Sequence, residues 1–297
     1  MPRARGYGSP FVLDGRDVVV TGAASGIGRE LCFQLSRRFS GCHIHMIDIN
    51  NAGLRDSRDA ILKEGSSTQV SNHHCDITDL PAFEKVLASI SESSKSSGRH
   101  VSVLVNNAGI VHGKSWEDLS IAEFQATVTL ASSSQFAAIK SFLPAMLEHN
   151  DGMIVTLASL MSVLPGCQLS DYCAAKHATL GLHNSIRLEL SCRRGNKVKM
   201  LSVLPYVVDT GMFHGAFQAP SLWMTRLLFP PLKTSDSVDR ILVGVSRSEM
   251  EIFLPRILTF AAQLSTVLPI PIFQSLIKYA GAADGMKTFQ GNKFFPK

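Results

Sequence analysis

A short apolar strand that runs into a glycine-rich loop and then into a helix is the feature that most limits the fold of this chain. Residues 17–20 are DVVV, residues 21–28 are TGAASGIG, and a helical pattern follows from residue 29 to 39. This order is the context in which a dinucleotide-binding loop occurs. Its glycines permit a tight turn, close approach to a pyrophosphate and close helix packing. The residues expected to contact such a cofactor are Gly22, Ser25, Gly26, Ile27 and Gly28. A glycine-rich turn that binds nothing is the alternative for the loop alone.

A second apolar stretch, residues 43–47, ends in Asp48, twenty residues after Gly28. An acidic residue at this distance hydrogen-bonds the adenosine ribose hydroxyls in dinucleotide-binding folds. Because a carboxylate repels a 2′-phosphate, Asp48 favours NAD over NADP. Its alternative role is that of an ordinary turn residue at a strand end. Asp76, which ends the next expected strand, is placed to reach the adenine.

Apolar strands alternate with helical segments along the chain, with further strands expected at residues 69–75, 101–105, 153–157 and 198–204. This alternation predicts an α/β fold, a single-domain Rossmann-type doubly wound parallel sheet with helices on both faces. Ligands bind such sheets at the carboxyl ends of the strands. Asn107, Ala108 and Gly109 follow one strand and are expected to lie against the cofactor.

The chain divides into three expected parts. Residues 1–13 form a basic flexible N-terminus, residues 14–250 the domain, with 213–235 as a substrate lid, and residues 251–297 an apolar C-terminal helical extension. The chain has 297 residues, 45% of them hydrophobic, and a net charge of +5. It has no long basic run, which argues against nucleic acid. Six dispersed cysteines without a Cys-x-x-Cys pair indicate reduced thiols and no metal site. No secretory signal or eighteen-residue apolar run is present.

Tyr172 and Lys176 are four residues apart, one turn of a predicted helix. An ammonium group close to a phenol favours the phenolate, and a phenolate near neutral pH is a usable general base. A surface pair without function is the alternative for this spacing alone.

Four signals together resemble the short-chain dehydrogenase/reductase family. They are the glycine loop, the Asn106-Asn107-Ala108-Gly109 segment, Ser159, which lies thirteen residues before the tyrosine, and Tyr172-x-x-x-Lys176. The resemblance implies that Tyr172 is the acid/base and that Lys176 binds the nicotinamide ribose. It also implies that Ser159 holds the substrate oxygen and that Val208 and Thr210 contact the cofactor. Hydride would then move between a nicotinamide and a carbinol carbon.

One position departs from the family pattern. The family usually has an asparagine twenty-eight residues before the serine, where this chain has Ala131. That asparagine holds a water in a proton relay from the lysine, which alanine cannot do. Thr129 or Ser132 would replace it only if the helix changed register. A catalytically weak nucleotide-binding protein is therefore an alternative to an active enzyme.

Further segments resemble the membrane-bound retinol dehydrogenase branch, which includes 17-beta-hydroxysteroid dehydrogenases. They are residues 110–115, 140–146, 171–173, 205–213 and 230–233 and the C-terminal residues 279–291. The implied substrate is a lipophilic alcohol or aldehyde, all-trans-retinol/retinal first and a steroid as the alternative. The resemblance also implies a homodimer facing the cytosol at the endoplasmic reticulum membrane or a lipid droplet surface, with a soluble cytoplasmic protein as the alternative. This branch usually has an N-terminal anchor, which this chain is expected to lack, so membrane contact would fall to residues 252–280.

Overall fold

A computed structural model of the chain contains one seven-stranded sheet in the order β3-β2-β1-β4-β5-β6-β7. It describes residues 6–291 except 66, 219–221, 223–226, 228, 280 and 282. All neighbouring strands are parallel, which confirms the predicted fold class. The strands are β1 (Asp17–Thr21), β2 (His43–Asp48), β3 (Gln69–His74), β4 (Val101–Asn106), β5 (Met153–Leu157), β6 (Lys199–Pro205) and β7 (Glu251–Leu254).

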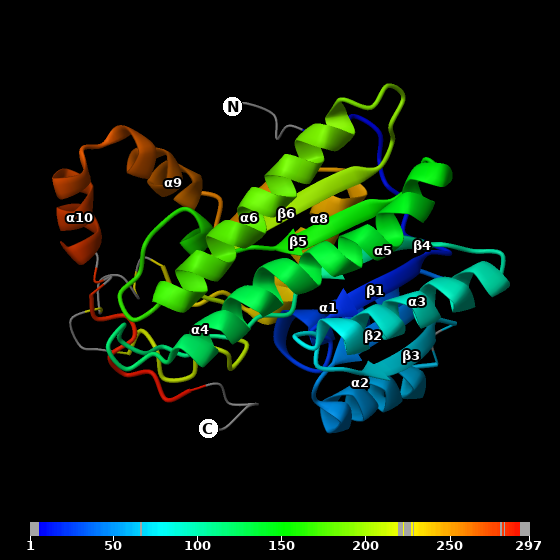
Figure 1. Cartoon of the computed structure of the whole chain (residues 1–297), viewed down its shortest axis with the longest axis horizontal. Coiled ribbons are helices and arrows are strands. Elements are labelled where there is room, and N and C mark those ends of the chain that lie inside the picture. Colours follow the sequence, from blue (N-terminus) through cyan, green and yellow to red (C-terminus); the bar gives the residue numbers. More distant parts are fainter. Residues whose placement is uncertain are drawn as a thin grey trace.

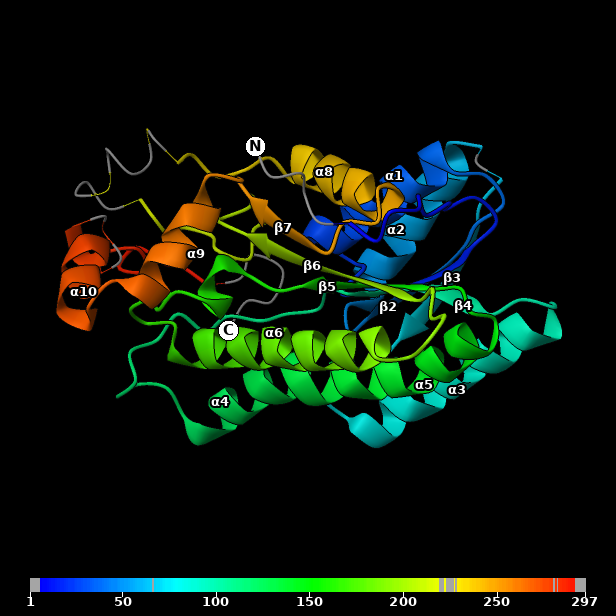
Figure 2. The same ribbon diagram turned by 90° about the horizontal axis from the view of Figure 1, so that it is seen from above.

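Helices cover both faces of the sheet, as Figure 2 shows with the sheet seen edge-on. One face carries α1 (Gly26–Arg38), α2 (Asn51–Lys63) and α8 (Thr234–Ser246). The other carries α3 (Leu80–Ser96), α4 (Ile121–Val128), α5 (Ser134–Glu148) and α6 (Ser170–Ser191), with a short 3-10 helix, η2 (Leu160–Ser162), before α6. Because side chains alternate along a strand, Val18 and Val20 of β1 join one core cluster and Val19 the other. Burial on both faces explains why β1, β4 and β5 are largely apolar, whereas the edge strand β3 is mostly polar and partly exposed.

The strand order reverses direction between β1 and β4, which are neighbours in the sheet but not consecutive in the chain. The loops that leave their carboxyl ends diverge toward opposite faces, and the crevice between them is where sheets of this type bind ligands. The glycine loop follows β1, and Asn107 follows β4. The fold therefore brings these two predicted cofactor segments together.

The expected domain boundary at residue 251 was wrong, because Glu251–Leu254 is strand β7 and pairs with β6. This strand has only four residues and is followed by Pro255, so its sequence pattern was too short to separate from the apolar stretch after it. The helices α9 (Leu258–Val267) and α10 (Ile270–Tyr279) come after β7 and extend from one end of the molecule (Figure 1). No helix among the described residues has both the length and the apolar character needed to cross a bilayer.

One further expectation also differs from the structure. Residues 6–13 are not a flexible tail, because Phe11 and Leu13 are buried in the core and the hydroxyl of Tyr7 hydrogen-bonds the backbone of β6. The helical segment of residues 121–148 is interrupted by a π-helix, η1 (Thr129–Ser133), while Pro144 lies inside α5 without ending it. Residues 1–5 of the N-terminus and Trp223, Met224 and Leu228 of the expected lid lie outside the described residues.

Candidate active site

The glycine loop has the backbone geometry that the sequence predicts. Gly22 and Gly26 have positive φ angles of 69° and 55°, a region that glycine adopts readily. Gly28 has no room for a side chain, since a Cβ there would lie 2.1 Å from the carbonyl oxygen of Gly22. Ser25 precedes α1 without a side-chain cap, and the first turn contains no acidic residue. The first N–H groups of α1 are thus left for an anion such as a pyrophosphate.

Asn107 connects the glycine loop to the end of β4. Its side-chain amide donates to the carbonyl oxygens of Thr21 and Gly22 at 2.9 and 3.0 Å. In return, the backbone N–H groups of Asn107 and Ala108 donate to Thr21 Oγ1 at 3.1 and 3.2 Å. Asn107 therefore shapes the cofactor site as well as lining it. The predicted site residues did not include Thr21, although it opens the glycine motif and its hydroxyl forms half of this clamp.

Asp48 lies at the end of β2, and both of its carboxylate oxygens accept backbone hydrogen bonds. Oδ2 accepts from Ala24 of the glycine loop at 2.9 Å, and Oδ1 accepts from Asn50 at 2.9 Å. Burial raises the pKa of Asp48, while these two bonds oppose the rise. The carboxylate thus holds the loop beside β2 and lines the cavity described next.

A cavity of about 390 Å³ lies over the carboxyl ends of the strands. Every predicted cofactor residue except Gly28, which packs beneath the loop, lines it. These lining residues are Gly22, Ser25, Gly26, Ile27, Asp48, Asp76, Asn107, Ala108, Gly109, Tyr172, Lys176, Val208 and Thr210. Among the described residues of the lining, Asp48 and Asp76 are the carboxylates and Lys176 is the cation. The shape and donor set therefore fit a nicotinamide dinucleotide, with two acidic groups where its adenosine end would lie.

Tyr172 and Lys176 are buried at one end of this cavity. Burial raises the pKa of Tyr172 to about 12, and a hydrogen bond with Ser159 opposes the rise. Lys176 donates from Nζ to the carbonyl oxygen of Leu157 at 2.7 Å, and burial lowers its pKa to about 8. Its Nζ lies 5.7 Å from the centre of the Tyr172 ring. In this structure the hydrogen bond from Ser159 favours the phenolate.

The structure places Ala131 in the π-helix between α4 and α5, where it is buried. Its carbonyl oxygen accepts a hydrogen bond from Thr179 Oγ1 of α6 at 2.8 Å. The hydroxyl of Ser132 donates to Val128 within its own helix at 2.6 Å. Although the helix does change register here, Ser132 does not take over the place of an asparagine side chain.

A second, largely apolar cavity of about 290 Å³ adjoins the first. The two share Pro205, Tyr206 and Phe213, and Ser159 lines the second. Ser159 hydrogen-bonds Tyr172, which lines the first cavity. Tyr172 and Ser159 therefore lie where the two cavities meet. The apolar residues that line the second cavity include Leu160, Met161, Leu164, Leu169, Phe217, Leu222, Phe229, Leu258, Ala261, Ile277 and Met286.

Residues 16–221 match the family model described as short chain dehydrogenase, and the chain belongs to this family of nicotinamide-dependent oxidoreductases. Retinol dehydrogenase 10-B of Danio rerio is 29% identical over 291 residues, which cover 93% of this chain and 85% of that protein. Epidermal retinol dehydrogenase 2 of Mus musculus is 30% identical over 280 residues, which cover 94% of this chain and 86% of that protein.

Solved structures of the same family share the fold. A short chain dehydrogenase/reductase from Burkholderia phymatum in complex with NAD superposes with a TM-score of 0.72 at 20% identity, covering 86% of this chain and 94% of that one. A putative NAD(P) dependent gluconate 5-dehydrogenase from Beutenbergia cavernae with bound NADP gives a TM-score of 0.69 at 27% identity, covering 83% of this chain and 97% of that one. Neighbours with either cofactor thus have this architecture.

Proposed function

We propose that the protein transfers hydride between NAD and a lipophilic alcohol or aldehyde, with all-trans-retinol/retinal as the first candidate. The observation that carries this proposal is the junction of the two cavities. Tyr172 and Ser159 lie between a cavity whose lining suits a dinucleotide and a more strongly apolar cavity that suits a long hydrocarbon. The retinol dehydrogenase names among the relatives support the same substrate class.

The residues at the junction suit proton management at a carbinol oxygen. When bound, the nicotinamide would supply the hydride acceptor or donor. Ser159 and Tyr172 hold the substrate oxygen, and the phenol of Tyr172 takes or gives the hydroxyl proton. Lys176 donates a hydrogen bond to the Leu157 carbonyl oxygen and lines the first cavity together with Tyr172. The apolar cavity holds the hydrocarbon and excludes water from the reacting atoms.

Charge at the adenosine end of the first cavity supports NAD over NADP. Asp48 and Asp76 line this end, Ile49 follows Asp48, and none of the described residues that line this end is a lysine or an arginine. A phosphate there would meet two carboxylates across a partly buried surface. Measuring kcat/KM for both cofactors tests this assignment, and a preference for NADP would contradict it.

A turnover assay tests the main proposal. Purified protein is mixed with NAD and all-trans-retinol in detergent, NADH formation is followed at 340 nm, and the aldehyde is quantified by chromatography. A parallel steroid panel tests the 17-beta-hydroxysteroid alternative. Tyr172→Phe is the matched control, because it removes one hydroxyl from the junction. Ala131 gives a reason to consider a catalytically weak protein. NAD binding without turnover of any retinoid or steroid would favour that alternative.

We also propose that α9 and α10 contact a membrane. On α9, Phe260, Leu264 and Val267 are 63%, 48% and 78% exposed and share one face by their spacing. On α10, Ile272, Leu276 and Tyr279 repeat this spacing and are 53%, 50% and 86% exposed. No described side chain of either helix is buried. Exposed apolar patches of this kind mark interaction sites.

Charge and position favour a bilayer as the partner of this face. Between Glu251 and Asp284 the sequence has two basic residues, Arg256 and Lys278, and no acidic residue. Such a segment suits the interface of an anionic membrane. Leu258, Ala261 and Ile277 of the same helices line the second cavity, so a lipophilic substrate would pass from the bilayer directly to the site. The proposed location is the cytosolic surface of the endoplasmic reticulum or a lipid droplet.

Flotation with anionic liposomes tests this contact. The double variant Leu264→Asp/Leu276→Asp is expected to lose liposome binding, because both side chains are exposed and would carry charge into the interface. Leu188→Asp, on α6, is the matched control, since Leu188 is a leucine with 67% exposure far along the chain from these helices. Equal flotation of both variants would contradict the proposal and leave the soluble cytoplasmic alternative. The homodimer also stays a proposal, which light scattering after gel filtration tests.

A further inference from the structure

Tyr172 lies in the first turn of α6, the part of a helix that frays most readily. The N-cap position is Leu169, which makes no side-chain hydrogen bond to the turn. The first N–H groups of a helix have no partner within the helix, so an uncapped turn is weakly held. A tyrosine that must meet a substrate oxygen within hydrogen-bond distance needs this turn to be fixed.

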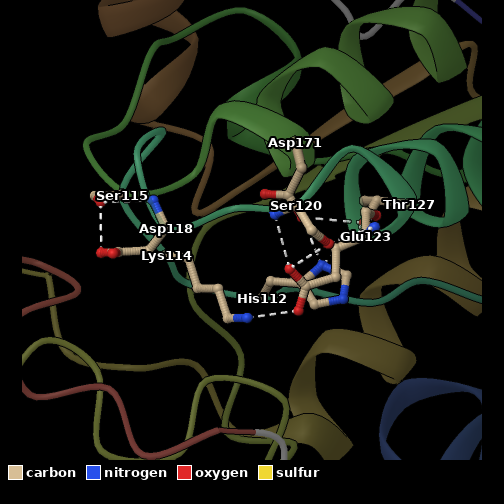
Figure 3. Close-up of polar contacts among 8 residues, drawn as sticks. All are labelled: His112, Lys114, Ser115, Asp118, Ser120, Glu123, Thr127 and Asp171. Carbon is tan, nitrogen blue, oxygen red and sulfur yellow. Dashed lines mark hydrogen bonds and ion pairs between the residues drawn. The ribbon is translucent and has the colours of Figure 1, made fainter.

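Asp171, the residue before Tyr172, supplies the missing attachment (Figure 3). Its side chain is 1% exposed, and its Oδ2 accepts hydrogen bonds from His112 Nδ1 at 2.8 Å and from Thr127 Oγ1 at 3.0 Å. Thr127 Oγ1 also lies 3.1 Å from His112 Nδ1 and 2.9 Å from the carbonyl oxygen of Glu123, with which it shares its one proton. Since a carboxylate in the first turn interacts favourably with the helix dipole as well, Asp171 stabilises this turn in two ways.

The two partners of Asp171 come from separate elements that are themselves anchored. His112 belongs to the loop after β4, and Thr127 belongs to α4. Two residues beyond His112, Lys114 forms an ion pair of 2.6 Å with Glu123, which also completes the capping box of α4 (Figure 3). The network thus connects the loop behind Gly109, the helix before the π-helix and the first turn of α6.

A second hydrogen bond between the same helical segments lies beyond the reactive residues. Thr179 of α6 donates to the carbonyl oxygen of Ala131 in the π-helix. Asp171 and Thr179 therefore attach α6 to the α4–π-helix segment on either side of Tyr172 and Lys176. Neither attachment involves a side chain at position 131.

We propose that Asp171 is a positioning residue for Tyr172, acting through Thr127 and His112. The three side chains fix the first turn of α6 against α4 and set the place of the phenol at the cavity junction. None of the three lines either cavity, so their effect on turnover passes through Tyr172. This inference rests on the proposed dehydrogenase function, but its structural part is measurable without turnover.

Thr127→Val tests the network, because it removes one hydroxyl and keeps the shape of the side chain. Loss of a buried hydrogen bond to a charged group corresponds to about a tenfold change. The variant is expected to lower kcat about tenfold with NAD affinity unchanged, and to speed amide hydrogen exchange in residues 170–173 about tenfold. Thr127→Ser, which keeps the hydroxyl, is expected to restore both. Asp171→Ala is expected to have the larger effect.

Ser132→Ala is the matched control, since it removes a hydroxyl from the same segment that bonds only within its own helix. If Thr127→Val matches Ser132→Ala in both kcat and exchange, the positioning role is refuted. A general loss of stability that Thr127→Ser does not reverse would refute it as well. Should the protein turn over no substrate, the exchange measurement still decides the role of the network, while the turnover assay alone decides the proposed function.

Discussion

Replacing Gly28 with alanine tests the idea that the glycine loop is shaped by contact rather than by flexibility. A Cβ at this position would lie 2.1 Å from the carbonyl oxygen of Gly22 and 2.6 Å from Asn107 Nδ2. Real Cβ contacts stay beyond 3.0 Å, so the Gly22 carbonyl would have to retreat by about 0.9 Å (3.0 − 2.1 Å). The atoms in the way are those that clamp the loop to β4, because Asn107 Nδ2 donates to Gly22 O.

The expected cost follows from these contacts. Forcing extra volume into a packed site costs about 1–3 kcal/mol, and loss of the clamp bond adds about 1 kcal/mol. Alanine in place of glycine within a helix offsets this by stabilising the helix by about 1 kcal/mol. Gly28→Ala should therefore lower the free energy of unfolding by about 1–3 kcal/mol. Since the loop that approaches the pyrophosphate must move, NAD affinity should fall about tenfold or more.

Gly181→Ala is the matched control. Gly181 is exposed within α6, has no positive φ angle, and a Cβ there would have no heavy atom within 4 Å. This substitution should raise stability by about 1 kcal/mol and leave NAD affinity unchanged. Urea unfolding followed by circular dichroism measures the first quantity, and NAD titration followed by tryptophan fluorescence or calorimetry the second. Two results together would refute the idea that contacts shape the glycine loop. They are the same urea midpoint for Gly28→Ala and Gly181→Ala, and an NAD affinity of Gly28→Ala equal to that of the unaltered protein.

Three further predictions concern two single substitutions and a pair of buried histidines. Tyr172→Phe should lower turnover at least about a hundredfold while NAD affinity stays within twofold, as seen by comparing kinetics with equilibrium binding; retained turnover would rule out the assigned acid/base. Asp48→Ser should reduce the preference for NAD over NADP. Because it removes the carboxylate that accepts a hydrogen bond from the Ala24 N–H, it should also lower the free energy of unfolding in urea by about 1 kcal/mol. An unaltered cofactor preference would contradict the proposed role of the Asp48 charge. Burial lowers the pKa of His45 and His183 to about 3, so both resist protonation in the folded state, and stability should be lost as pH falls from about 6.5 toward 3. At pH 5 each contributes a loss of about 2 kcal/mol, and equal urea midpoints at pH 5 and pH 8 would refute this.

The parts of the molecule that could be predicted are those written in short stretches of sequence. A strand, a glycine loop and a helix follow one another within residues 17–38. The positive φ angles of the loop and its close packing depend on the glycines themselves. Asp48 ends β2 and Asp76 lies two residues after the end of β3, and parallel pairing of these strands brings both to one edge of the sheet. These residues line the first cavity together because the fold class fixes where strand ends meet.

The parts that could not be predicted depend on contacts between distant elements. Strand β7 exists because β6 offers a free edge to pair with, which a four-residue pattern does not reveal. In the network around Asp171, His112 is 59 positions and Thr127 is 44 positions away from Asp171 in the chain. No local sequence spacing links either residue to Asp171. The role of Asn107 as a clamp likewise becomes visible only when the end of β4 lies beside the glycine loop.

Tyr172 and Lys176 show how tertiary structure can oppose a local electrostatic argument. Spacing on a helix suggests that Lys176 favours the phenolate of Tyr172, yet burial acts on both groups and favours the neutral form of each. The pKa of Tyr172 rises to about 12 and that of Lys176 falls to about 8. The phenol therefore rests protonated at neutral pH, which suits donation of a proton to a carbonyl oxygen during reduction of an aldehyde. Oxidation of an alcohol instead requires the phenolate, which the hydrogen bond with Ser159 favours. Positive charge brought next to the phenol by an oxidised nicotinamide would act in the same direction as Ser159. Burial of the Tyr172 phenol thus opposes alcohol oxidation, which needs the charged form, and does not oppose aldehyde reduction, which needs the neutral form.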